Sequence, residues 1–294
     1  MPEVKGEYPG KPNKPLSDAE LKAIATAKYE SKVDDAPQSE AEVEAFDFPT
    51  EIVELPSRGM LYPADSPLSK GTIEMKYMTA KEEDILSNQS FIKNGVVLDK
   101  LFKALIVSKC DYNEMLLCDK NAVMIAARIL GYGKDYDATF TSPTTGELIT
   151  HTIDLTQIGE KEIDWSIHEK GKNEFPFELP NSKRNVTLRI MTQSVQRSYD
   201  KEIKGLEKLK KSAPSSTLLK YVITSLDGDT DNAKIRKFVD NQLLAVDARA
   251  IRKYLTSITP EIDMDIEVPD GDTGDTFRSS FAIGLDFFWP DAKI

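Results

Sequence analysis

The side chains in this sequence best suited to bind a metal are the carboxylates of a short acidic loop. Asp227, Asp229 and Asp231 alternate along the chain, which is the spacing of the first three ligands of a calcium-binding loop. Such a loop also needs a glycine for its sharp turn and a bidentate glutamate that closes it, and this sequence has Asn232 and Phe238 at those places. We therefore interpret the segment as an acidic turn.

A second acidic loop, from Asp270 to Asp275, has the composition of a hairpin tip. Gly271 and Gly274 suit the positive φ angles that tight turns require. The least favoured function for this chain is therefore that of a metal-dependent hydrolase using the two acidic loops, around Asp227 and Asp270.

The other residue types that carry enzyme chemistry are scarce. Cys110 and Cys118 lack both the Cys-x-x-Cys spacing and a nearby histidine, so we expect two structural thiols and no zinc. The two histidines, His151 and His168, neighbour no serine or cysteine nucleophile motif. The run Gly131–Gly133 lacks the spaced Gly-Lys-Ser/Thr of a phosphate-binding loop. We predict that the protein is not an enzyme and has no cofactor.

Composition limits the classes of partner. The 294 residues include 38 Lys and Arg against 49 Asp and Glu, a net charge of −11. This excess argues against nucleic acid or an anionic membrane as the partner, because both require a basic surface. The most basic stretch, 204–211, contains an interleaved glutamate and no aromatic residue, which favours a solvated helix face or a protein contact. No apolar run approaches a membrane span of about 20 residues, and no apolar signal core begins the chain, so we expect an intracellular protein.

Residues 1–48 differ from the rest. They contain five prolines and no phenylalanine before Phe46. We predict a disordered acidic arm, which either folds onto a partner or stays solvated. Within it, the pattern over 16–32 indicates a helix with a thin apolar stripe.

The pattern from 49 to 158 predicts a first α+β module. A strand at 51–55 precedes a Pro/Gly turn, and 72–78 alternate polar and apolar residues as a strand does. Thr79 and Glu82 form a capping-box pattern that opens a helix. Helical spacing follows over 97–106, Asp119 is expected to cap a third helix, and 136–140 with 148–155 suggest a hairpin.

The same order recurs from 179 to 294, after a connecting segment at 159–178. Leu179-Pro180 corresponds to Leu55-Pro56, and 186–192 to 73–79. Helices are expected at 194–211 and 218–226, Asp247 stands where Asp119 stood, and 262–268 with 276–283 suggest another hairpin. We predict an α+β fold of two similar modules, each of strands, a small helical bundle and a hairpin. Two unrelated α+β stretches are the alternative.

Four segments in order carry a resemblance to a known family. They are 55–63 (Leu-Pro-Ser-Arg-Gly-Met-Leu-Tyr-Pro), 71–86, 92–95 (Ile-Lys-Asn-Gly) and 131–133 (Gly-Tyr-Gly). Together they resemble the baseplate hub subunit and assembly proteins of T4-type contractile-tailed bacteriophages, which are related to tail assembly chaperones. The similarity is strong over 50–155 and follows only the outline of the second half.

This resemblance bears on metal binding as well. In many relatives the hairpin after Gly-Tyr-Gly carries a Cys-x-x-Cys-Gly knuckle, whereas this chain has Ser142-Pro143-Thr144-Thr145-Gly146. Pro143 and Gly146 keep the turn, but hydroxyls are poor zinc ligands, so we predict no zinc there.

The resemblance implies a non-enzymatic protein that binds other hub proteins during tail assembly in the host cytoplasm. A permanent structural component of the baseplate in the virion is the alternative. Candidate partner contacts are Leu55, Pro56, Arg58, Gly59, Leu61 and Tyr62 in the motif, and Phe287, Phe288 and Trp289 near the C-terminus. For both sets the favoured interpretation is structural: the motif residues suit a turn and a core edge, and the aromatic residues suit burial in the second module.

Overall fold

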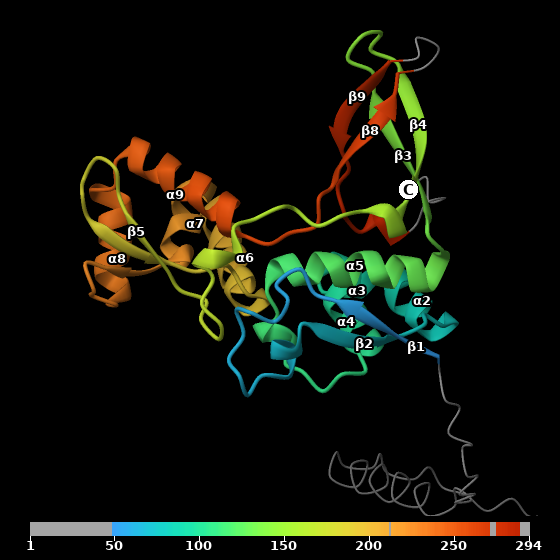
Figure 1. The fold of residues 1–294 in the computed structure, drawn as a ribbon, viewed down its shortest axis with the longest axis horizontal. Coiled ribbons are helices and arrows are strands. Elements are labelled where there is room, and N and C mark those ends of the chain that lie inside the picture. The colour runs from blue at the N-terminus through green and yellow to red at the C-terminus, as the bar shows by residue number, and fades with distance from the viewer. Residues whose placement is uncertain (1–48, 212, 271–274, 289–294) are drawn as a thin grey trace, which may run out of the picture. The chain divides into compact units, whose positions relative to one another are not determined.

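A computed structural model describes residues 49–211, 213–270 and 275–288, all within one compact unit, Phe48–Ile294 (Figure 1). The fold is mixed α+β, with helices and small antiparallel sheets of two or three strands, as predicted. The arm predicted at 1–48, with its helix at 16–32, lies outside the described residues. Within the described ranges, no helix is both long and apolar enough to cross a membrane.

The first half of the described chain, which we call the first repeat, begins with an antiparallel pair of strands in which Val53 lies opposite Ile73. The capping box predicted for Thr79 and Glu82 is present at the helix that follows. The elements of this repeat are β1 (Thr50–Glu54), β2 (Thr72–Lys76), α2 (Ala80–Ser87), α3 (Gln89–Lys93), α4 (Val97–Leu105), α5 (Leu117–Tyr132), β3 (Asp135–Thr141) and β4 (Leu148–Asp154).

The second repeat follows a similar order. Its elements are β5 (Phe175–Glu178), β6 (Asn185–Leu188), α6 (Gln193–Lys208), α7 (Pro214–Val222), β7 (Ile223–Leu226), α8 (Asn232–Asn241), α9 (Ala245–Ile258), β8 (Asp265–Pro269) and β9 (Thr276–Ser280). Strand β5 starts at Phe175, inside the segment expected to be a connection.

One prediction for the second repeat was wrong, and one helix was missed. The helix expected over 218–226 ends at Val222, and Ile223–Leu226 form a strand that pairs with β6. Helix α8 was not predicted at all. Asp231 caps its first turn by accepting the N–H of Ala233, and one apolar face is buried.

The two repeats share local details. Helices α4 and α7 both have nine residues, and each is followed by an extended isoleucine, Ile106 or Ile223. Ile106 forms a bridge with Met75 of β2, and Ile223 pairs with Leu188 of β6. The strand–helix–strand arrangement is therefore the same in both repeats.

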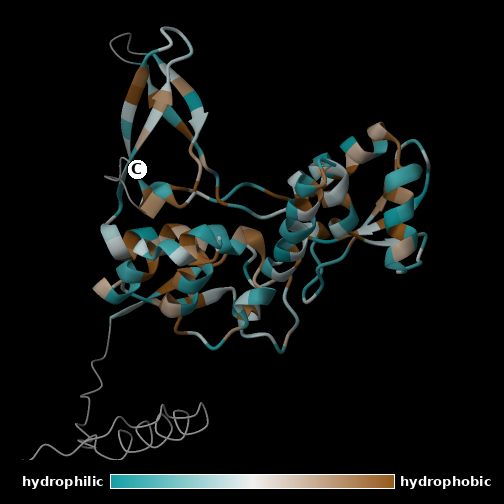
Figure 2. Ribbon diagram, turned by 180° about the vertical axis from the view of Figure 1, so that it is seen from behind, coloured by the Kyte–Doolittle hydropathy of each residue, from teal (hydrophilic) through white to brown (hydrophobic). Residues whose placement is uncertain are grey.

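Both predicted hairpins are confirmed. Strands β3 and β4 pair with Ala138 opposite His151, and β8 and β9 pair with Glu267 opposite Arg278. The alternation of polar and apolar residues along these strands is visible in Figure 2. Figure 1 shows the two hairpins side by side, and the rings of Tyr136 and Phe281 lie 6.2 Å apart between them.

Candidate functional site

One buried carboxylate, that of Asp119, holds the Leu-Pro-Ser-Arg-Gly turn. Its Oδ1 accepts the N–H of Ser57 at 2.8 Å, and its Oδ2 accepts the hydroxyls of Ser57 and Tyr62, each at 2.6 Å. The Tyr62 oxygen in turn accepts the N–H of Leu116 at 2.9 Å. We call Ser57, Tyr62, Leu116 and Asp119 the Asp119 node.

The predicted role of Asp119 as a helix cap is wrong. The capping position of α5 belongs to Leu116, whose backbone is extended, and Asp119 is the third residue of the helix. Its carboxylate points to a turn 62 residues earlier in the chain instead of to its own helix. A carboxylate is also favoured in this first turn by the helix dipole.

The chemistry of the node is that of a structural contact. Burial raises the pKa of Asp119, although the hydrogen bonds from Ser57 and Tyr62 oppose it. Burial and the neighbouring Asp119 raise the pKa of Tyr62, and burial raises that of the Cys118 thiol. Ser57 and Asp119 are both fully buried, so the serine hydroxyl has no surface at which a substrate could react.

Two glycines, Gly59 and Gly71, lie against each other's backbone. Gly59 and Gly71 have φ angles of +71° and +73°. A Cβ atom at Gly59 would lie 2.3 Å from the carbonyl oxygen of Ser69, and one at Gly71 would lie 2.7 Å from the carbonyl carbon of Arg58. Any side chain at either position would separate the two segments.

A second carboxylate plays the corresponding part in the second repeat. Asp247 accepts the N–H groups of Asn181 and Ser182 at 2.9 and 3.1 Å, in the turn after Leu179-Pro180. It too is the third residue of its helix, so the predicted cap is again wrong, and Leu244 has the capping position. Burial alone would raise the pKa of Asp247, but these hydrogen bonds outweigh it and the pKa lies below its ordinary value.

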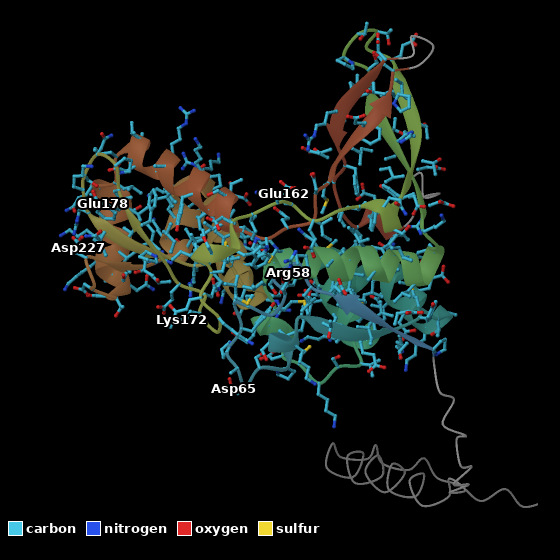
Figure 3. The ribbon with its side chains drawn as sticks, in the orientation of Figure 1. Arg58, Asp65, Glu162, Lys172, Glu178 and Asp227 are labelled. Atoms are coloured by element: carbon cyan, nitrogen blue, oxygen red, sulfur yellow. The ribbon has the colours of Figure 1, made fainter. Side chains whose placement is uncertain are left out.

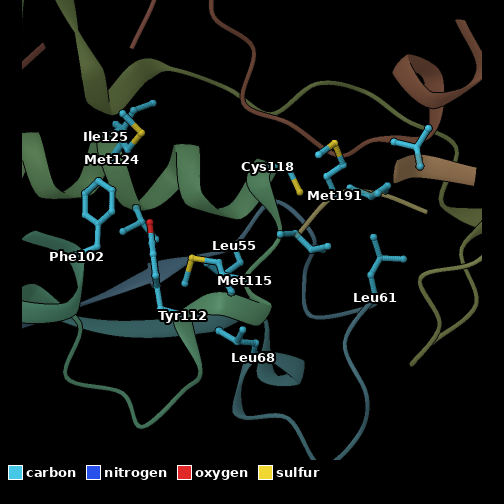
Figure 4. Packing of buried hydrophobic residues seen from close by; sticks show 14 of the residues in the cluster. Leu55, Leu61, Leu68, Phe102, Tyr112, Met115, Cys118, Met124, Ile125 and Met191 are labelled. Carbon is cyan, nitrogen blue, oxygen red and sulfur yellow. The ribbon is translucent and has the colours of Figure 1, made fainter. Parts of the chain in front are cut away.

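The two repeats meet beside the Asp119 node. Leu117 donates its N–H to the carbonyl of Met191 at 3.0 Å, and Gln193 donates to the carbonyl of Met115 at 2.8 Å. We call residues 115–118 the Leu116 edge and residues 191–193 the Met191 segment. Figure 4 shows Met191 close to Cys118 in the buried cluster.

An ion pair lies at the border of this contact. The carboxylate of Asp99 on α4 accepts the Nε2–H of Gln193 at 3.0 Å and the Nη2–H of Arg197 at 2.8 Å. Polar and apolar contacts thus fix the start of α6 against the first repeat.

Most of the candidate partner contacts in the motif are interior residues. Leu55, Pro56, Gly59, Leu61 and Tyr62 are all buried. In contrast, Arg58 has 59% of its side chain exposed, forms an ion pair with Glu160 at 3.0 Å and stacks over the ring of Trp165 at 4.7 Å (Figure 3). The role of these residues in binding a partner stays a prediction, and Arg58 is the member of the set that the fold presents to solvent.

The aromatic residues near the C-terminus pack on the first repeat, not within the second module as one interpretation had it. Phe287 and Phe288 are fully buried. The ring of Phe287 lies 4.7 Å from that of Tyr136, and the ring of Phe288 lies 6.4 Å from that of Phe102. Arg128 donates its Nε–H to the carbonyl of Phe287 at 3.1 Å. Trp289 lies outside the described residues.

The acidic loop at 227–231 uses its carboxylates within the fold. Asp227, at the periphery in Figure 3, binds Arg184 and the N–H of Asn185. Asp229 pairs with Lys234, and Asp231 caps α8. In the part of the chain that the structure describes, no group of three or more His, Cys, Asp or Glu side chains is placed to hold a metal ion.

A hydroxyl organises the hairpin turn of residues 142–146, where the sequence predicts no zinc. The Oγ of Ser142 accepts the N–H groups of Thr144 and Thr145 at 3.1 and 3.0 Å. Gly146, with φ +76°, closes the turn by donating to the carbonyl of Ser142. Hydrogen bonds to the hydroxyl and the carbonyl of Ser142 thus stabilise this turn.

An open groove of about 820 Å³ runs along β1 and β2, bordered by Ile52, Glu74, Pro67 and Cys110. Burial raises the pKa of the Cys110 thiol, which keeps it a poor nucleophile.

No known protein family, curated protein or solved structure gives a match to this chain.

Proposed function

We propose that this chain is a non-enzymatic assembly protein of the baseplate hub of a contractile-tailed bacteriophage, and that it binds other hub proteins in the infected cell. The proposal starts from the resemblance of 55–63, 71–86, 92–95 and 131–133 to that family.

The observation that carries the proposal is that three of these separate segments, 55–63, 71–86 and 131–133, pack against one another. Gly59 and Gly71 are in backbone contact, and the strand that follows Gly71 pairs with the strand before Leu55. A Cβ atom at Gly131 would lie 3.0 Å from the side chain of Met78. A resemblance spread over one contiguous piece of structure supports a shared fold better than four independent short matches would.

The chemistry of the surface favours binding over catalysis. The serine–carboxylate pair of Ser57 and Asp119 is sealed in the interior. Meanwhile Ile52, Leu244 and Val246 expose 74%, 50% and 59% of their surface. Single exposed apolar side chains are common on protein surfaces, but Leu244 and Val246 lie close together in the chain, and neighbouring exposed apolar residues are typical of protein–protein contacts.

The proposal is tested by interrupting the gene in the phage that encodes the chain. Electron microscopy of infected-cell lysates should show no complete baseplates, and supplying the intact chain from a plasmid should restore them. Normal numbers of complete tails without the chain would refute the proposal.

A further inference from the structure

Each half of the contact between the repeats has an equivalent elsewhere in the chain. Leu116 precedes α5 as Leu244 precedes α9, with φ and ψ of −66° and 148° against −70° and 145°. Each stands three residues before the aspartate that holds the Leu-Pro turn. Residues 243–246 therefore correspond to the Leu116 edge, and we call them the Leu244 edge.

The two edges differ in what covers them. Leu116 and Cys118 are 1% and 2% exposed, because the Met191 segment lies against them. The corresponding Leu244 and Val246 are 50% and 59% exposed. The Leu244 edge is thus exposed to solvent, whereas the corresponding Leu116 edge is buried.

The other half of the contact is also duplicated. Thr192 stands at the N-cap position of α6 as Thr79 does at that of α2, both with extended backbone, so residues 78–80 correspond to the Met191 segment. We call them the Met78 segment. Ile190 is 4% exposed, whereas the corresponding Tyr77 is 37% exposed. Gln193 is buried, and the corresponding Ala80 is exposed.

The backbone N–H and C=O groups of the existing contact also differ from those at the corresponding positions. In the existing contact, the first residue of each helix donates its N–H, and the residue before each cap supplies the carbonyl. The corresponding groups are the N–H of Ala245 with the carbonyl of Leu243, and the N–H of Ala80 with the carbonyl of Met78. Within the described residues, none of these four groups makes a hydrogen bond. Two donors and two acceptors of the kind that join the repeats are thus without a partner among the described residues.

We propose that a second copy of this chain occupies the Leu244 edge, head to tail, through its own Met78 segment. The N–H of Ala245 then donates to Met78 of the next copy, and the N–H of Ala80 in that copy donates to Leu243. The same backbone geometry already joins the two repeats within one chain, so the contact continues an existing interface. This inference holds independently of the hub function.

The contact between copies is weaker than the one within the chain. Asp99 and Arg197 are the third residue of α4 and the fifth of α6, and the corresponding residues are Ser216 of α7 and Asp84 of α2. The ion pair is therefore not repeated. Association depends on apolar burial and backbone hydrogen bonds, and it rises with protein concentration. Because the two surfaces differ, the contact builds rings or open chains.

The test uses proline substitutions that remove one donor and spare the fold. Ala245→Pro and Ala80→Pro each change the first residue of a helix, where proline is tolerated. The residues before them, Leu244 and Thr79, are already extended, as a residue before proline must be. Gln89→Pro, at the exposed first residue of α3, is the matched control. Full-length proteins are compared by sedimentation velocity over a concentration series.

The parent should form species of two or more chains of 32.9 kDa as its concentration rises. Ala245→Pro and Ala80→Pro should each weaken this association by about tenfold or more, and Gln89→Pro should leave it unchanged. A mixture of Ala245→Pro and Ala80→Pro should form a complex of two chains and nothing larger. Ala80→Pro retains an intact Leu244 edge, and Ala245→Pro retains an intact Met78 segment.

Leu244→Asp provides a second variant, since aspartate is a favourable capping residue that preserves α9. It should also prevent association, while Leu148→Asp should not. A parent that stays monomeric throughout the series would overturn the proposal. So would folded proline variants that associate like the parent, or a mixture that contains only single chains.

Discussion

Asp119 and Asp247 are the third residues of α5 and α9, and each accepts N–H groups from the turn after a Leu-Pro pair. Their pKa values nevertheless move in opposite directions. Burial raises the pKa at both carboxyls and prevails at Asp119, whereas at Asp247 it is outweighed by the hydrogen bonds from Asn181 and Ser182 together with the charge of Lys183. The same aspartate-to-turn contact therefore occurs in both repeats with opposite shifts of the aspartate pKa.

This difference predicts opposite pH dependence for Asp119→Asn and Asp247→Asn. A raised pKa in the folded state means that Asp119 contributes stability fully below the ordinary aspartate value of about 3.9, and loses it as pH rises through the raised pKa. Asp247, with a lowered pKa, contributes above about 3.9 and loses its contribution as pH falls through the lowered value.

Urea unfolding of the parent and both variants from roughly pH 3 to 7 measures this. The advantage of the parent over Asp119→Asn should shrink as pH rises, and its advantage over Asp247→Asn should shrink as pH falls. Two differences that change in the same direction with pH would contradict the assignment.

Gly59→Ala should destabilise the fold far more than Gly95→Ala. Both positions have positive φ, so both variants carry the backbone cost of about 1 kcal/mol. Only at Gly59 does the new Cβ meet backbone, at 2.3 Å from the Ser69 oxygen, whereas nothing lies within 4 Å at Gly95. We expect a further loss of about 1–3 kcal/mol for Gly59→Ala in chemical unfolding. Equal losses for the two variants would show that the close contact of the two segments has no energetic role.

Phe288→Ala should loosen the first repeat although it changes the C-terminal end of the described chain. Phe288 is fully buried against Phe102 of α4, so its removal leaves a cavity and should cost about 3–5 kcal/mol. Hydrogen exchange should quicken in α4 and α5. Phe91→Ala, at a half-buried phenylalanine of the same repeat, is the control and should have a smaller effect. Faster exchange confined to β8 and β9 would argue against this packing.

Arg58→Ala should reduce binding to hub proteins with little loss of stability. Its ion pair with Glu160 is exposed, and exposed pairs contribute little to folding. Lys172→Ala removes a comparably exposed pair, with Glu169, and is the matched control. Capture of hub proteins from infected-cell lysate by the tagged chain should fall for Arg58→Ala alone. Equal capture by both variants would remove Arg58 from the partner surface.

Local patterns were sufficient to predict much of the fold. The alternation of 72–78, the capping box at Thr79 and the two hairpins all depend on neighbours within a few residues, and all are present. Where a helix and a strand were contiguous, as at Val222 and Ile223, the apolar run concealed the boundary. Helix α8 had a usable signal in the spacing of Ile235, Phe238 and Val239, beside an acidic loop that suggested only a turn.

The candidate site was harder to predict because its contacts are long-range. An aspartate near the start of a helix predicts a cap. Only the tertiary fold brings Asp119 to Ser57, which is 62 residues away in the chain. The destination of Phe287, beside Tyr136, likewise has no local signature. The equivalence of Leu116 and Leu244 was present in the sequence repeat, but which of the two edges is covered depends on tertiary structure.

Quantitative mass spectrometry of purified phage particles, beside the lysate of infected cells, tests the proposed function most directly. Peptides from both repeats should be abundant in the lysate together with hub proteins, and absent from finished particles if the chain is a transient assembly protein. A fixed small copy number per particle would instead make it a permanent component of the hub. Absence of the chain from both the lysate and the particles would contradict a role in tail assembly altogether.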